Sequence, residues 1–424
     1  MNSIRQKIFL TLFVAIVVLA SVLIPLPSAS APLIVNHTSV EKYKDIPQYW
    51  IDQVKKMWLN VPGESHSRGY RNGLDFLENI DPRFQVNRKD DADPEPYTEQ
   101  HLRVSGHRRD DGGYWSYGAG EENWYTNAAG IANIKAHIAY SNTHNLAIAA
   151  IGFAWCWDMT WHNEPGGSID SVYQVHWAGS SEGGPEGDLR WGLDAGDQAL
   201  TGNSVSMDTY LSATQQYIDF AAANGFPTKV FFTTGPVDEY SGESGYQRHL
   251  KQQHIRNYVN SHEGILFDYA DILQWGDDGS QQTETWTDYS NTLVTFPKMH
   301  PNNMLDFGGG YAEDGDHIGE RGALRLGKAM WWMLARIAGW DGVSAGPPPV
   351  DPAPVDPPPV DPPPAGPPPP GPPPAASLSS SGGGGGSCSI SAGGETDRGT
   401  LIGMVLVVLS PVIVLAARKA MKKG

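Results

Sequence analysis

Cysteine is nearly absent from this 424-residue chain, which contains only Cys156 and Cys388. Cys156 lies in the long central region and Cys388 lies near the C-terminus, so the central region can form no internal disulfide and no cluster of thiolate metal ligands. A single thiol between Trp155 and Trp157 is typical of a small buried residue, and we expect no nucleophilic role for Cys156.

Positive charge is also scarce, with 30 Lys and Arg residues against 47 Asp and Glu residues and a formal net charge of -17. Nucleic acids and anionic lipid surfaces bind to basic patches, so neither is an expected ligand of the folded region. Paired metal-ligand spacings such as His-x-x-x-His are missing too, although His162, His176 and His300 are present. We therefore expect a neutral or cationic substrate, no metal and no cofactor.

Long apolar runs are confined to the two ends of the chain. At the N-terminus, basic residues precede an apolar stretch from residue 8 to residue 26, and small residues follow up to Ala31. This three-part layout is typical of a secretory signal. We predict that residues 1–31 are a signal peptide, cut after Ser30 or Ala31. An uncleaved membrane anchor is the alternative.

The C-terminal end has the reverse layout. A linker rich in Pro, Gly and Ser, residues 345–387, precedes an apolar segment, residues 401–417, and a basic end. Proline repeats favour an extended polyproline conformation, so the linker is expected to act as a stalk without a packed core. The apolar segment is near the shortest length that crosses a bilayer, and the basic end is expected to stay in the cytoplasm. This topology predicts an exported folded region, tethered at the cell surface or membrane.

Residues 388–424 begin at Cys388, directly after the run GGGGGS. With the short apolar span and the basic end, this pattern resembles the Gly/Cys-type C-terminal sorting signals of bacterial surface proteins, of which GlyGly-CTERM is one kind. The resemblance implies that a sorting protease removes the span and that Cys388 or its neighbourhood becomes the anchoring point. A plain transmembrane anchor is the alternative, and in both cases the C-terminal segment attaches the protein to a membrane.

The central region, residues 32–344, has a length that suits a single α/β domain. Short apolar runs between turn residues predict strands covered on both faces, at residues 57–63, 83–86, 145–153, 228–236 and 264–269. Apolar residues at three- and four-residue spacing predict helices over residues 206–225 and 247–264. Strands that alternate with helices indicate a parallel sheet of about five strands with helices on both faces.

Ligands of such sheets bind at the carboxyl ends of the strands. The first predicted strand is followed directly by a Gly-Glu-Ser turn that ends at Ser65, which places a serine at that edge. A serine becomes a useful nucleophile only where a base takes its proton and an acid orients the base. Asp314 and His317 have suitable types and spacing, and they immediately precede an amphipathic helix that ends at Gly339.

The Gly-acid-Ser turn after the first strand and the Asp-x-x-His before the last helix resemble the SGNH/GDSL hydrolase superfamily. The resemblance extends over most of the central region and implies a flavodoxin-like, three-layer α/β/α fold and ester hydrolysis. It also implies that Ser65 is the nucleophile, His317 the base and Asp314 the acid that orients the base. Ser67 is a rival nucleophile, and His66 is expected to shape the turn rather than to act as the base.

The sequence departs from the superfamily pattern at the groups that bind the oxyanion. The third block of the superfamily reads Gly-x-Asn-Asp, whereas the corresponding strand end here contains Gly152 and Asp158 with no Asn between them. A missing oxyanion donor costs about 2–4 kcal/mol of transition-state stabilisation unless another group replaces it. The candidate donors are Gly106, Gly152 and Asn163, together with the backbone N–H of Ser65.

Aromatic and polar side chains gather on the loops that are expected to follow the third and fourth strands. The candidate substrate-binding residues are Trp155, Trp157, Asp158, Trp161, His162 and Asp238. Tryptophan rings suit the apolar faces of sugars, and an acidic surface does not oppose a neutral glycan. The Gly-rich segment 176–192 is predicted to be a substrate loop.

These observations predict an exported, surface-tethered serine esterase that removes O-acyl groups, with an acetyl ester on carbohydrate as the expected substrate. The alternative is a catalytically inactive SGNH-like surface protein that binds glycans. A lipid esterase would need an exposed apolar lid, of which the polar, Gly-rich insertions give no sign.

Overall fold

The computed structural model describes residues 31–63, 65–90, 92, 94–110, 113–115, 126–154, 168–177, 191–202, 205–237, 241–305 and 318–343, without the side chains of residues 65, 108–110 and 113–115. The chain divides into two units, residues 1–351 and 352–424, and every described residue belongs to the first. Apart from Ala31, the predicted signal peptide, linker and sorting signal lie outside the described residues. Within the described ranges, no helix is both long and apolar enough to cross a membrane.

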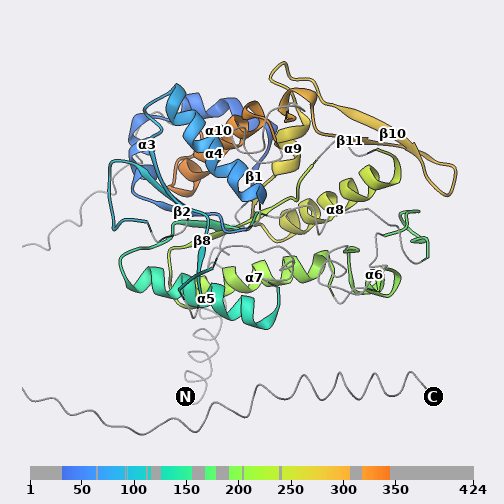
Figure 1. The fold of residues 1–424 in the computed structure, drawn as a ribbon, viewed down its shortest axis with the longest axis horizontal. Helices are drawn as coiled ribbons and strands as arrows, with labels where there is room; N and C mark the ends of the chain where they lie inside the picture. Colours follow the sequence, from blue (N-terminus) through green and yellow to red (C-terminus); the bar gives the residue numbers. More distant parts are fainter. Residues whose placement is uncertain are drawn as a thin grey trace, which may run out of the picture. The chain divides into compact units, whose positions relative to one another are not determined.

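A seven-stranded sheet forms the centre of the first unit, and all of its neighbouring strands run parallel (Figure 1). The strands lie in the order β1-β9-β8-β7-β2-β4-β3. Their bounds are Leu33–Val35 for β1, Trp58–Asn60 for β2, Val86–Lys89 for β3, Leu102–Ser105 for β4, Ala150–Gly152 for β7, Lys229–Thr233 for β8 and Ile265–Phe267 for β9. The predicted α/β fold with a parallel sheet is confirmed.

The predicted set of about five strands omits β1 and β4. β1 has only three residues and borders the predicted signal peptide. β4 reads LRVS, and all four of its residues are buried. Its charged second residue interrupts the apolar pattern by which a buried strand is predicted. The guanidinium of Arg103 is accommodated inside the domain because it donates to the carbonyl oxygen of Lys56 at 3.2 Å.

Two antiparallel hairpins stand apart from the parallel sheet, and neither is among the predicted strands. β5 (Arg108–Asp110) pairs with β6 (Gly113–Trp115), and β10 (Thr283–Thr287) pairs with β11 (Leu293–Pro297). The β10–β11 hairpin extends past α8, Gly242–Ser261 (Figure 1).

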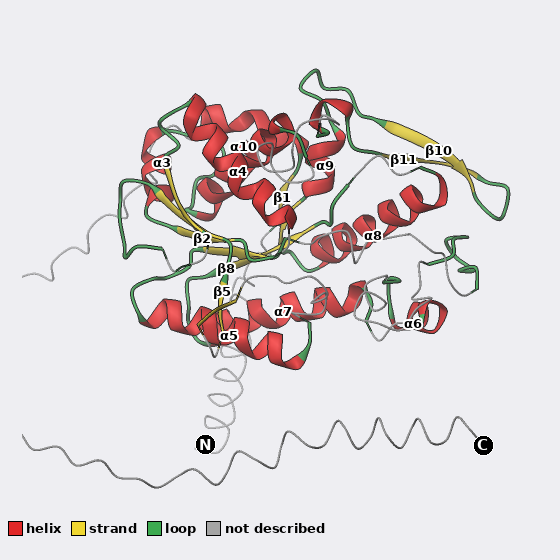
Figure 2. Ribbon diagram, in the orientation of Figure 1, coloured by secondary structure: helices red, strands yellow, loops and turns green. Residues whose placement is uncertain are grey.

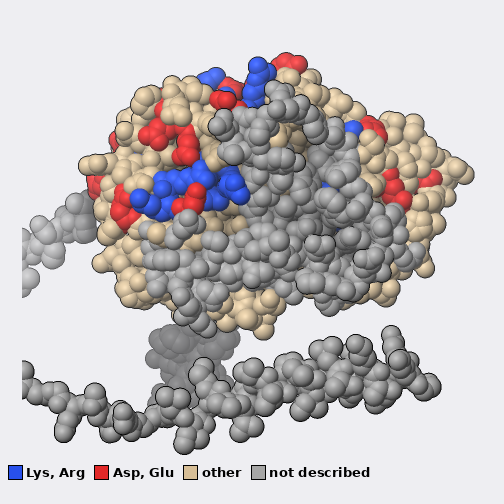
Figure 3. Space-filling model, in the orientation of Figure 1, with Lys and Arg blue, Asp and Glu red and all other residues tan. Residues whose placement is uncertain are grey.

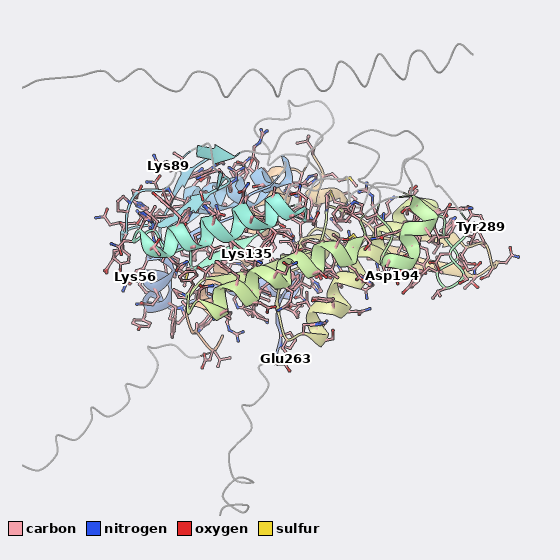
Figure 4. All side chains as sticks on the ribbon, turned by 90° about the horizontal axis from the view of Figure 1, so that it is seen from below. Lys56, Lys89, Lys135, Asp194, Glu263 and Tyr289 are labelled. Carbon is pink, nitrogen blue, oxygen red and sulfur yellow. The ribbon has the colours of Figure 1, made fainter. Side chains whose placement is uncertain are left out.

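Helices form one layer on each side of the sheet (Figure 2). One face is covered by α3 (Gln48–Lys55), α4 (Ser65–Ile80) and α10 (Glu320–Ile337), and the other by α5 (Ala128–Thr143), α7 (Met207–Ala223) and α8. Each layer encloses its own apolar cluster with the sheet. Figure 4 shows α5 and α7 side by side on the second face, where Lys135 donates to the side chain of Gln216 at 3.5 Å.

The predicted helices over residues 206–225 and 247–264 are confirmed as α7 and α8. Ser206 caps α7 through a reciprocal capping box, and Gly225 takes a left-handed φ of 67° just after the helix. α8 begins earlier than predicted, at Gly242. The amphipathic helix expected before Gly339 is α10.

α4 and α10 cross backbone to backbone. A Cβ atom added at Gly73 would lie 1.9 Å from the carbonyl oxygen of Ala323, and one added at Gly327 would lie 2.1 Å from the carbonyl oxygen of Gly73. Both positions need glycine, because either Cβ atom would overlap the opposite backbone. The crossing therefore fixes the position of α10 relative to α4, the helix that begins at Ser65.

Candidate active site

The turn that joins β2 to α4 is held against the end of β7. Gly63 forms a parallel bridge with Ala154, whose N–H donates to the carbonyl oxygen of Pro62 at 3.2 Å. The φ of Gly63 is 151°, and a Cβ atom there would lie 2.1 Å from the carbonyl oxygen of Ala154. Only glycine fits this position. The turn consequently brings Ser65, as the first residue of α4, to the carboxyl edge of the sheet.

The two residues after Ser65 have buried side chains. The hydroxyl of Ser67 donates to the carbonyl oxygen of Val61 at 2.5 Å, which ties the first turn of α4 to the strand before it. This bond gives Ser67 a structural role and disfavours it as the nucleophile. The ring of His66 packs edge to face against the ring of Tyr269, with centroids 6.0 Å apart. Both residues thus support the turn from inside the domain.

The last helix begins at the same edge of the sheet. α9 (Tyr269–Gln274) follows β9 directly, and the side chain of Asn303 donates to a carbonyl oxygen of α9 at 2.8 Å. The N–H of Gly319 in turn donates to the carbonyl oxygen of Asn303 at 2.9 Å, just before α10 starts. The described chain resumes at Ile318, which is buried. Asp314 and His317 lie outside the described residues.

A buried hydrogen-bond network joins the ends of β2 and β4. Asn60 Nδ2 donates to Ser105 Oγ and to the carbonyl oxygen of His107, both at 2.7 Å. Trp58 Nε1 donates to the same serine hydroxyl at 2.7 Å. Because Gly106 lies between Ser105 and His107, the network fixes this glycine relative to the strand that leads to Ser65. The network does not follow from the sequence, where its only signal is a polar residue at the end of each apolar strand.

Gly106 also packs directly on Arg71. A Cβ atom at Gly106 would lie 2.2 Å from Arg71 Cζ, so the missing side chain makes room for the guanidinium. Arg71 Nε donates to the carbonyl oxygen of Ser67 at 3.3 Å, and its Nη1 forms an ion pair with Asp90. Burial lowers the pKa of Arg71 to about 10, while Asp90 opposes the shift. The guanidinium is therefore still charged at neutral pH, and it lies at the carboxyl edge beside Gly106.

Of the other predicted site residues, only Gly152 lies within the described ranges. Gly152 is the last residue of β7, and a Cβ atom there would lie 2.1 Å from the Phe231 ring of β8. Close packing between strands accounts for this glycine, and its role as an oxyanion donor stays a prediction. Predicted site residues outside the described ranges are Trp155, Trp157, Asp158, Trp161, His162, Asn163 and Asp238.

Charged side chains at this edge form ion pairs. Arg88 pairs with Asp75 at 3.1 Å and with Asp90 at 2.7 Å, which joins α4 to β3. Figure 3 shows Lys and Arg side chains gathered among Asp and Glu in the area of α4 and β2. In the part of the chain that the structure describes, no group of three or more His, Cys, Asp or Glu side chains could hold a metal ion.

Comparisons with protein-family models and with curated proteins gave no match. Among solved structures, the chain is similar to a candidate acylhydrolase from Bacteroides fragilis, with 10% sequence identity and a TM-score of 0.31 over 70% of this chain and 95% of the other. It is also similar to a candidate lipolytic protein of the G-D-S-L family from Desulfitobacterium hafniense, with 9% identity and a TM-score of 0.30 over 66% and 99%. A third similar structure is a GDSL-like lipase from Bacteroides thetaiotaomicron, with 10% identity and a TM-score of 0.31 over 66% and 88%.

Proposed function

We propose that this chain is a serine esterase of the SGNH type that cleaves O-acyl esters. The observation that supports the proposal is the β2–α4 turn, in which Gly63 closes against Ala154 and Ser65 becomes the first helical residue at the carboxyl edge. The first turn of a helix carries N–H groups without intrahelical partners and a partial positive charge. Both features favour a serine alkoxide and a developing oxyanion at this point.

In the proposed reaction, Ser65 Oγ attacks the ester carbonyl carbon while His317 accepts the serine proton and Asp314 orients His317. The tetrahedral intermediate then collapses to an acyl-enzyme, and the alcohol leaves with the proton from His317. Water attacks the acyl group with the help of the same base, which releases the acid and restores the serine hydroxyl. The start of α10 at the same edge as α4 supports these roles, because His317 directly precedes Ile318 in the sequence.

We assign the oxyanion donors to the backbone N–H groups of Ser65 and Gly106, with Gly152 and Asn163 as further candidates. Gly106 suits this role because the Asn60 network holds it and Arg71 fills the space beside it. A donor of this kind contributes about 2–4 kcal/mol of transition-state stabilisation. Its N–H would replace the Asn that the sequence lacks at the end of the third predicted strand.

The substrate that we propose is a neutral acylated glycan, with acetyl as the acyl group. The net charge of -17 supports a neutral polymer over an anionic one. The candidate contact residues are the tryptophans and polar residues that follow β7, together with Asp238 after β8. An exported location, a C-terminal membrane attachment and a sorting protease as partner belong to the same proposal, and they rest on the sequences of the two ends.

The proposal is tested by p-nitrophenyl acetate hydrolysis with the full-length protein and its Ser65→Ala and His317→Ala variants. We expect kcat/KM to fall by about 10³-fold or more in each variant, since removal of a nucleophile or its base disables the whole triad. Ser67→Ala and His144→Ala are the matched controls, and they should keep most of the turnover per folded molecule. Full activity in Ser65→Ala would refute the assignment.

A second candidate function is glycan binding without turnover, which the missing block-three Asn favours. It predicts that the full-length protein binds an acetylated oligosaccharide and releases no acetate from it. Calorimetric titration with acetylated xylotetraose, followed by an acetate assay on the same sample, separates the two functions. Acetate release that Ser65→Ala abolishes would exclude the second candidate.

A further inference from the structure

A cavity of about 380 Å³ lies between α8 and the strands at one edge of the sheet, β9 and β1. Its apolar part comes from Ile34 of β1, Leu266 of β9 and Pro297 of β11. Neighbouring strands are about 4.8 Å apart, so β9 and β1 lie roughly 15–20 Å from β2, the strand that leads to Ser65. The cavity is thus separate from the candidate active site.

One face of α8 supplies the polar wall of this cavity. His249, Gln253, Arg256 and Asn260 follow one another at intervals of four, three and four residues, which places them on the same side of the helix. A helix that covers a sheet normally presents apolar side chains to it. Ile255 and Val259 do so over the inner strands, whereas the cavity-lining face is polar.

The charged groups of the cavity are already paired within the protein. Arg256 donates to both carboxylate oxygens of Asp268, from Nε at 2.6 Å and from Nη2 at 2.8 Å. Asp271 accepts from the ring of His37 at 2.5 Å. Burial and the charge of Arg256 lower the pKa of His249 to about 4, so its imidazole is neutral at neutral pH. Every charged group of the described lining thus has a partner inside the protein, and Arg256 offsets one of the two carboxylates.

Three carboxamides of this lining each keep an amide atom without a partner in the described residues. Asn36, Gln253 and Asn260 each use one amide atom inside the protein: Asn36 Oδ1 accepts from Thr38, Gln253 Oε1 accepts from Arg256, and Asn260 Nδ2 donates to a backbone oxygen. Within the described residues, Asn36 Nδ2, Gln253 Nε2 and Asn260 Oδ1 have no hydrogen-bond partner. These amide groups, and the buried Nδ1 of His249, which also lacks a partner in the described part of the chain, lie in the same lining as the apolar side chains of Ile34 and Pro297.

We infer that this cavity binds an uncharged sugar unit of a carbohydrate chain. A sugar ring combines an apolar face with hydroxyl groups that both donate and accept, which matches the partly exposed side chains of Ile34 and Pro297 together with the amides of Asn36, Gln253 and Asn260. The volume lies within the usual range for small-molecule sites, about 300–1,000 Å³. The inference goes beyond the proposed esterase, because it requires neither Ser65 nor turnover.

The test is calorimetric titration of the full-length protein with four uncharged tetrasaccharides, those of glucose in β- and α-linkage, of xylose and of mannose. We expect at least one of them to bind. Gln253→Leu keeps the side-chain size but removes the amide, and with Asn260→Ala it should weaken binding by about tenfold or more, since each hydrogen bond contributes roughly 0.5–1.5 kcal/mol. Gln216→Ala on α7 is the matched control and should leave the affinity unchanged.

Ser65→Ala separates this inference from the proposed function. It should retain the affinity of the unmodified protein for the tetrasaccharide, whether or not the chain hydrolyses esters. The inference is overturned if none of the four sugars binds at 10 mM, if only tetragalacturonate or a neutral tetrapeptide binds, or if the variant with both Gln253→Leu and Asn260→Ala binds as well as the unmodified protein. A thermal unfolding curve of each variant confirms that weaker binding does not reflect loss of the fold.

Discussion

Gly63→Ala is the substitution that most directly probes the turn before Ser65. The new Cβ atom would start 2.1 Å from the carbonyl oxygen of Ala154, more than 1 Å inside an ordinary carbon–oxygen contact of about 3.3 Å. Overpacking of this kind costs about 1–3 kcal/mol, and a non-glycine residue at positive φ costs about 1–3 kcal/mol more. The free energy of unfolding should therefore fall by about 2–6 kcal/mol.

The same substitution should move Ser65, because the turn can relieve the overlap only by leaving the end of β7. A displacement of about 1 Å at a reacting group lowers the rate by roughly 10²-fold. Stability is measured by urea unfolding of the full-length protein, and turnover with p-nitrophenyl acetate under conditions in which the variant is folded. The two losses together would indicate a turn that both stabilises the domain and positions the proposed nucleophile, Ser65.

Gly225→Ala is the matched control, since Gly225 has a positive φ of 67° but open space where a Cβ atom would lie. It should lose about 1–2 kcal/mol from the backbone conformation alone and keep its turnover. The difference between the two variants isolates the contact with Ala154. If Gly63→Ala were no less stable than Gly225→Ala and equally active, the close approach of the turn to β7 would be wrong.

Three further substitutions test other contacts. Gly327→Ala should push α10 away from Gly73, with a loss of about 1–3 kcal/mol of stability in urea unfolding and a fall in turnover. Burial lowers the pKa of Lys251 to about 7 from 10.5. The stability that neutral Lys251 provides is fully present above pH 10.5 and is lost as the pH falls to 7. Lys251→Met should therefore raise the unfolding free energy at pH 7 by about 1–4 kcal/mol. Burial lowers the pKa of His249 to about 4 from 6.5, so the stability that neutral His249 provides above pH 6.5 is lost as the pH falls to 4. His249→Gln should reduce the loss across this range by up to about 3 kcal/mol.

Each of these predictions has a contradicting result. A Gly327→Ala variant with unchanged stability would show that α4 and α10 do not touch at this point. A Lys251→Met variant that is less stable at pH 7 would show that the contact of the ammonium group with the Trp177 ring, 5.8 Å away, outweighs the cost of its burial. Lys229→Met at an exposed position should change little. An equal loss of unfolding free energy between pH 6.5 and pH 4 with and without His249→Gln would show that the imidazole titrates normally in the fold.

The fold could be predicted where local sequence and burial agree. α7 has a capping serine, regular apolar spacing and a terminal Asn-Gly, and β8 is an apolar run covered on both faces. β4 could not be predicted, because Arg103 breaks its apolar pattern and is accommodated through hydrogen bonds to the carbonyl oxygens of Lys56, which is distant in sequence, and Glu95. Short strands of this kind depend on their neighbours in the sheet more than on their own residues.

In the candidate site too, local sequence predicts some features, while contacts between distant residues determine others. Ser65 could be placed at the edge of the sheet, because the position of the turn follows from the strand before it and the helix after it. The link from Asn60 to Ser105 and His107 could not be predicted, since it joins residues from two strands whose adjacency is set by the whole sheet. The cavity between α8 and the edge strands β9 and β1 likewise depends on which face of α8 meets those strands, and the sequence of the helix alone does not determine that.

The central claim, that Ser65 is the nucleophile, is tested most directly by covalent labelling. A fluorophosphonate probe reacts with an activated serine, whose oxygen forms a bond to phosphorus as fluoride leaves. We predict that mass spectrometry of the labelled full-length protein finds one phosphonate on the peptide that contains Ser65, and that the label disappears in Ser65→Ala and falls sharply in His317→Ala. A label on Ser67, or no label on the folded protein, would contradict the account.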